Sequence, residues 1–151
     1  MAIAITLHVI AAVLWVGGMF FAWMILRPVA AGQLEPPARL TLWRGVFDRF
    51  FPWVWASVAV LLVTGLWMLF AVFGGMAGAR WHIHLMLLVG LGMMAIYLHV
   101  WFAPYRRLCR AVEAADWPEG GRQLGQIRRL VGINLILGLL TVAIASGGRY
   151  L

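Results

Sequence analysis

Hydrophobic positions dominate four long stretches of the chain, and short segments containing most of the polar residues separate them. The stretches cover about residues 2–26, 51–73, 81–103 and 130–147. About 20 apolar residues are enough to cross the hydrocarbon core of a membrane as a helix. None of the stretches alternates in polarity as a membrane strand would, so each is expected to be helical. The pattern predicts an all-α integral membrane protein, a four-helix bundle in a single domain.

The composition agrees with this interpretation and excludes two other classes of protein. Of the 151 residues, 64% are hydrophobic and only 11% are charged. Soluble domains are closer to half apolar and a quarter charged, and disordered chains are poorer still in apolar residues. The lipid bilayer is therefore the predicted environment.

The net charge of +7 comes from arginine alone, since the chain has no lysine. Ten of the twelve arginines lie in the segments between the first and second and between the third and fourth stretches. These ten are Arg27, Arg39, Arg44, Arg49, Arg106, Arg107, Arg110, Arg122, Arg128 and Arg129. Only Arg80 and Arg149 fall on the other side. Arginine marks the cytoplasmic side, so both termini are predicted outside (periplasmic) in a bacterial inner membrane, and the charge does not indicate nucleic acid binding.

The two arginine-rich segments are themselves expected to be partly helical. Apolar residues recur at helical spacing at Leu40, Trp43, Phe47 and Phe50. This spacing predicts an interfacial helix leading into the second span. A Trp-Pro-Glu-Gly-Gly run at 117–121 predicts the turn before the fourth helix, which is expected to begin near Arg122.

All four histidines of the chain lie inside the predicted spans or at their ends. All five acidic residues lie in the arginine-rich segments. Ionisable groups in a membrane are costly and suggest function. Counting along the helices places His8, His82 and His84 near the outer surface and His99 near the inner surface.

The helical step of 100° per residue predicts which histidines share a face. His84 and His99 fall on one face of the third span, with Gly92 between them, and His82 points roughly the other way. That shared face is expected to be turned toward the bundle core. His99 has no second histidine at its depth, so it is interpreted as a polar contact or as one ligand of an incomplete site.

The leading functional hypothesis is a haem b site. On the first span, the face of His8 carries Trp15 and Gly18, and small residues beside a histidine leave room for a flat macrocycle. Two histidines at one depth, His8 and His84, would be the axial ligands. The predicted role is one-electron transfer near the outer face, with a redox protein as partner.

The alternative hypothesis is copper handling. Imidazole and thioether both suit copper(I), and His8, His82, His84 and Met86 lie near the outer face. A copper-carrying protein would then be the partner. A third interpretation is an accessory subunit of a membrane complex, or a homo-oligomer.

The first span, LHVIAAVLWVGGMFFAWMILRP, resembles the first helix of the CopD and HemJ groups of the wider cytochrome b superfamily. The third and fourth, ARWHIHLMLLVGLGMMAIYLHVWF and IRRLVGINLILGLLTVAIA, also resemble CopD proteins. The CopD resemblance implies copper resistance or uptake across the inner membrane. The HemJ resemblance implies haem b binding and oxidation of protoporphyrinogen IX, with His8 and His99 at the positions of the histidines.

The sequence departs from the HemJ pattern in two places. That pattern has a lysine near the start of the third helix, where this chain has His82-Ile83-His84. It also has an acidic residue with a proline in the fourth helix, where Asn134 stands without those neighbours. These departures argue against the oxidase activity.

Overall fold

The computed structural model describes residues 1–148, and within them all regular structure is helical. The first rod is built from α1 (Ala2–Phe20), η1 (Phe21–Leu26) and α2 (Arg27–Gln33), and the second is α3 (Pro36–Ala71). The third rod joins α4 (Trp81–Val100), η2 (Trp101–Tyr105) and α5 (Arg106–Glu113), and the fourth is α6 (Trp117–Gly147). All four rods are long and apolar enough to cross a membrane, which confirms the predicted four-span helical architecture.

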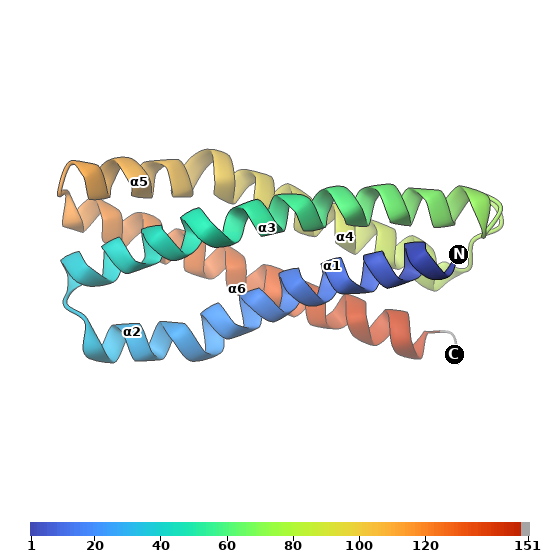
Figure 1. Ribbon diagram of the computed structural model, residues 1–151, viewed down its shortest axis with the longest axis horizontal. Helices are drawn as coiled ribbons and strands as arrows, with labels where there is room; N and C mark the ends of the chain where they lie inside the picture. The colour runs from blue at the N-terminus through green and yellow to red at the C-terminus, as the bar shows by residue number, and fades with distance from the viewer. Residues whose placement is uncertain (149–151) are drawn as a thin grey trace.

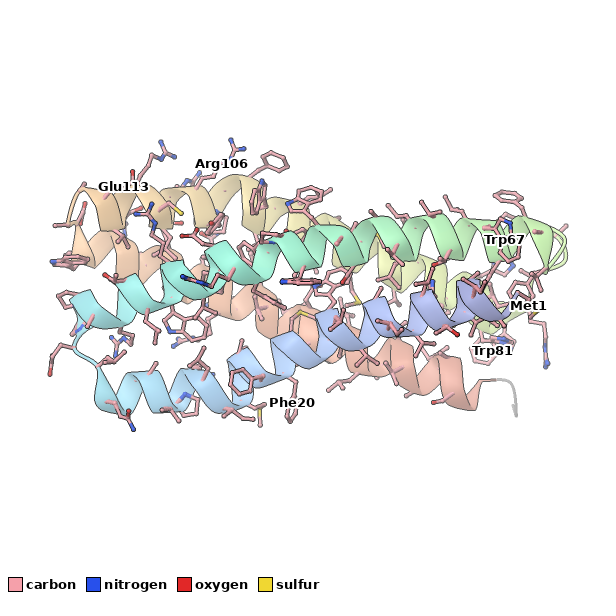
Figure 2. All side chains as sticks on the ribbon, viewed as in Figure 1. Met1, Phe20, Trp67, Trp81, Arg106 and Glu113 are labelled. Atoms are coloured by element: carbon pink, nitrogen blue, oxygen red, sulfur yellow. The ribbon has the colours of Figure 1, made fainter. Side chains whose placement is uncertain are left out.

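The rods lie side by side and alternate in direction (Figure 1). Met1, the 72–80 loop and the end of α6 lie at one end of the bundle, which we call the terminal end. The turns after α2 and after α5 lie at the other, which we call the arginine end. Trp67 and Trp81 mark the terminal end, and Arg106 and Glu113 lie toward the arginine end (Figure 2). Arg149, predicted on the side of the termini, lies outside the described residues.

The rods are longer than the predicted spans. The 36 residues of α3 correspond to about 54 Å, against about 30 Å for a hydrocarbon core. The bundle therefore extends beyond the bilayer as continuous helices. The prediction of a separate interfacial helix before residue 51 was wrong, because Leu40, Trp43 and Phe47 are buried within the bundle as part of α3.

The turn before the fourth helix also differs from its prediction. It lies at residues 114–116, where Ala115 has a φ of 53°, and α6 begins directly after it at Trp117. Asp116 caps α6 by accepting a hydrogen bond from the Glu119 amide at 3.1 Å. Pro118 is accommodated in the first helical turn, where a missing amide proton costs nothing, so the proline belongs to the helix start.

Two prolines near the arginine end sit beside π-helical turns. Pro28 is the second residue after η1, and Pro104 lies inside η2. A proline within a helix lacks an amide proton and clashes with the carbonyl one turn earlier. A wider π turn relieves this clash locally, so the first and third rods continue through their prolines.

The core is concentrated in the arginine half of the bundle. An aromatic cluster fills it, made of Trp15, Trp43, Phe47, Phe51, Trp55, Tyr97, Trp101 and Tyr105. At its centre Phe51 stacks on Phe47 with ring centroids 5.0 Å apart and meets Tyr105 edge-on at 4.8 Å. Such aromatic contacts add to the free energy of packing, so this half is the more rigid one.

Candidate functional site

His8 is the best-defined polar group of the terminal half. Its Nδ1 lies 2.8 Å from Thr64 Oγ1 on α3, and Thr64 donates its single hydroxyl proton to the Val60 carbonyl at 2.6 Å. The hydroxyl can therefore only accept from the imidazole, so Nδ1 carries the proton. The free lone pair of the neutral ring is then on Nε2. An imidazole with one nitrogen held as a donor has its other nitrogen ready for a metal ion.

A glycine lets α1 and α3 approach each other at this point. A Cβ at Gly65 would lie 3.3 Å from His8 Cε1, so the absence of a side chain there leaves room for the ring. Trp15, two turns along α1, is 3% exposed and meets Tyr97 edge-on with centroids 6.2 Å apart. Trp15 therefore belongs to the aromatic cluster. His8 lies on the same helix between that cluster and the terminal end of the bundle.

His82 lies at the same end, at the start of α4. Its Nδ1 is buried without a hydrogen-bond partner among the described residues, and its ring meets Trp81 edge-on at 5.9 Å. It packs against the end of α6, since a Cβ at Gly148 would lie 3.0 Å from His82 Cβ. A buried nitrogen without a hydrogen-bond partner is unusual in folded proteins, and it makes Nδ1 of His82 a candidate ligand atom.

His84 is held by the loop before α4. Its Nε2 donates to the Ala79 carbonyl at 3.2 Å, which leaves the lone pair on Nδ1. Farther along the same stripe Leu88 is 69% exposed, and Gly92 and His99 are exposed as well. The face shared by His84 and His99 thus turns away from the bundle.

The prediction that this face is turned toward the core was therefore wrong. The inward stripe of α4 is formed by Met93, Tyr97 and Val100, which are all buried. His82 and Met86 precede Met93 on this stripe at helical spacing and are partly buried. The side chains of the His82 stripe are thus the ones that lead into the bundle.

The glycines predicted to make room for a macrocycle are used differently. A Cβ at Gly18 would clash with the ring of Phe50 from α3, so Gly18 provides a close contact between two helices. Gly92 has no neighbour within 4 Å of its missing side chain and lies on the exposed face. Because Phe50 fills one place and the other faces outward, these residues do not fit a haem between His8 and His84.

The remaining candidate ligands are the imidazoles of His8 on α1 and His82 on α4 and the thioether of Met86 on α4. Within residues 1–148, no group of three or more His, Cys, Asp and Glu side chains could hold a metal ion. This part of the chain therefore does not form a closed site from three or more of these side chains. His8, His82 and Met86 supply the softer donors that suit copper(I).

Thr64 is the functional candidate that the sequence analysis missed. It is a single hydroxyl in an apolar span, and such residues usually bond to their own helix, as Thr64 also does with Val60. The sequence did contain one signal, which is the position of Thr64 along its helix relative to that of His8. In the antiparallel pair of α1 and α3, Thr64 is about as far from the intervening turn as His8.

Comparison with known proteins identifies the family of the chain. The family described as copper resistance protein D, CopD, matches residues 44–147, well over half of the 151 residues. His82, His84, Met86 and Thr64 lie within the matched region, and His8 lies before it. No curated protein and no solved structure gives a match. With four membrane-spanning helices and this match, the chain is a multi-pass membrane protein that belongs to the CopD family of copper resistance proteins.

Proposed function

We propose that the protein handles copper(I) as cargo at its terminal end, with His8 as the central ligand. The observation that carries this proposal is the arrangement of His8, Thr64 and Val60. Two hydrogen bonds fix the imidazole tautomer so that Nε2 keeps its lone pair. Membership of the CopD family supports copper as the metal.

His82 and Met86 are the proposed further ligands. The buried Nδ1 of His82 has no hydrogen-bond partner among the described residues, and Met86 follows on the same inward stripe. A cargo site must bind its ion well enough to capture it and weakly enough to release it. Two imidazoles and a thioether, without a closed set of charged ligands, meet that requirement for copper(I).

We also propose the orientation and the surroundings of the site. The positive-inside rule puts the arginine end in the cytoplasm, so His8 and His82 would face the outside of a bacterial inner membrane. A copper-carrying protein of that compartment is the proposed partner. A reporter active only in the cytoplasm, fused after Leu151, is expected to be inactive, and an active fusion would reverse the orientation.

Copper(I) binding to the full chain in detergent tests the ligand assignment. Competition with a chromophoric copper(I) chelator measures the affinity. We expect Thr64→Val to weaken binding about tenfold, since a hydrogen-bond partner that orients a metal ligand contributes that much, and Thr64→Ser to restore it. His8→Ala is expected to weaken binding more than Thr64→Val.

His99→Ala is the matched control, because His99 is an exposed histidine of α4 outside the proposed site. It is expected to leave the affinity unchanged. Equal losses for His8→Ala and His99→Ala would show that copper binds nonspecifically to histidine. The same variants in proteoliposomes, with copper(I) outside and a chelator inside, would then report whether binding leads to passage.

A further inference from the structure

A cavity of about 260 Å³ lies at the arginine end, between the first rod, α3 and α6. Its walls include the three arginines Arg27, Arg39 and Arg128 and the indoles of Trp23 and Trp43. Among the described residues that line it, none is acidic. The surface of the cavity is therefore mainly apolar, and three arginines border it without an acidic residue beside them.

The three arginines have no carboxylate partner in the described part of the chain. The ion pairs found there use Arg44, with Asp48 and Glu113, and Arg122, with Glu119. Positive charges that border one cavity without a carboxylate partner favour an anion bound among them. Guanidinium is also the side chain best suited to bind phosphate through two parallel hydrogen bonds.

Trp23 holds two of these arginine positions in place. The guanidinium carbon of Arg27 lies 4.4 Å from the centre of the Trp23 ring, a cation–π contact. The indole nitrogen of Trp23 donates to the Arg128 carbonyl at 3.1 Å. A Cβ at Gly132 would lie only 2.8 Å from that nitrogen, so the glycine makes room for the indole. The wall of the cavity is thus preorganised.

The depth of the cavity identifies its environment. The first apolar stretch ends at residue 26 and the fourth begins at residue 130, so Arg27 and Arg128 lie where the hydrocarbon core ends. Ala22 and Val131 line the cavity on the hydrocarbon side. Lipid phosphates, arginine and tryptophan all gather at this level of a membrane.

From these observations we propose that this arginine–tryptophan cavity binds the phosphate headgroup of an anionic phospholipid. Its volume is below the roughly 300–1,000 Å³ of pockets that enclose whole drug-sized ligands, which suits a headgroup whose acyl chains stay in the bilayer. The proposal is independent of copper handling at the terminal end.

Native mass spectrometry of the full chain in detergent tests the proposal with phosphatidylglycerol, phosphatidylcholine and inorganic phosphate as probes. We expect phosphatidylglycerol to be retained about tenfold better than phosphatidylcholine, since basic residues at a membrane surface favour anionic lipid by such factors. The triple variant Arg27→Gln, Arg39→Gln, Arg128→Gln is expected to abolish this preference. Circular dichroism of the same sample checks that the variant is folded.

A second triple variant removes the same charge elsewhere at the arginine end. Arg106, Arg107 and Arg110 are exposed on α5 and do not line the cavity. Changing these three to Gln is expected to leave the preference intact. An equal loss in both triple variants, or no preference in the wild type, would overturn the proposal.

Displacement of phosphatidylglycerol by millimolar inorganic phosphate would assign the cavity to a soluble anion instead. Should the cavity variant not fold, Arg39→Gln alone is expected to reduce the preference, and an unchanged preference would also overturn the proposal.

Discussion

The two halves of the bundle differ in what they bury. The arginine half encloses the aromatic cluster and the fully buried side chains of Leu108 and Ile127. The terminal half buries fewer side chains, among them Ala11, Thr64 and Leu69, and it contains the histidines His8, His82 and His84. One half therefore has the packing that stabilises the fold, and the other has the groups that could bind a metal ion.

This difference suggests a division of roles within one short chain. Densely packed aromatic rings hold the four rods in register, because a core that is packed to crystal-like density resists displacement. The sparsely packed end can then open and close around a cargo without loss of the fold, since regions that must move are those with few buried contacts. Substitutions that separate stability from copper binding test this division.

The largest effect on stability is expected for Phe51→Ala in the arginine half. Phe51 is 3% exposed and contacts Phe47, Tyr97 and Tyr105. Removing its ring should cost about 3 kcal/mol of unfolding free energy, measured by denaturation in detergent. The matched control Phe70→Ala removes a ring that is 65% exposed from the terminal half of the same helix, and should cost far less. Equal losses would contradict the proposed difference between the halves.

The second-largest effect on stability is expected at the contact between α1 and α3. A Cβ at Gly18 would clash with Phe50, whereas a Cβ at Gly17 has no neighbour within 4 Å. We expect Gly18→Ala to cost about 1–2 kcal/mol by overpacking. Gly17→Ala should be neutral or slightly stabilising, because alanine favours the helix. A melting temperature unchanged in both variants would show that Phe50 moves aside without cost.

A smaller effect is expected at the hydrogen bond between α6 and α4. Asn134 donates from Nδ2 to the Met93 carbonyl at 3.0 Å. Asn134→Leu should lower stability by about 0.6 kcal/mol, the mean for such bonds inside membranes. Thr141→Val is the control, since the Thr141 hydroxyl bonds only to the Leu137 carbonyl of its own helix. Copper(I) affinity should not change in either variant.

The smallest effect is expected for the exposed ion pair at the arginine end. Arg44 Nη2 lies 2.6 Å from Glu113 Oε1, and the two side chains are 30% and 61% exposed. A double-mutant cycle with Arg44→Ala and Glu113→Ala should give a coupling of about 0.5 kcal/mol. The coupling should fall as salt is added, because exposed charges are screened. A coupling that salt does not change would indicate a shielded pair.

Much of the fold was predictable from the order of apolar and charged residues. The four spans follow from the length of the apolar stretches, and the predicted partly helical character of the arginine-rich segments is confirmed, for example by α5 (Arg106–Glu113). The full length of the rods was not predictable from hydropathy. The start of α3 is polar on one face and buries Leu40 and Trp43 on the other, a pattern shared by interfacial helices and by helices that extend a bundle.

The inward face of α4 could not be predicted from the sequence, and the reason is physical. In water a helix shows its core face by polarity, but lipid is as apolar as the core, so Leu88 on the outside and Met93 on the inside look alike. The partners of His8 and Gly18 were hidden for a related reason. Each depends on a contact between two helices, with Thr64 and with Phe50, and a single helix does not contain that information.

The chain of hydrogen bonds from His8 to Thr64 and on to Val60 determines how metal binding at His8 depends on pH. Since both protons in that chain are already assigned, the imidazole offers one lone pair, and a copper ion and a proton compete for it. Acidification would therefore displace the metal while leaving the Nδ1–Thr64 bond in place, because the imidazolium still donates from Nδ1. Acidification of the compartment that the terminal end faces would thus empty the proposed site without disturbing the helices that form it.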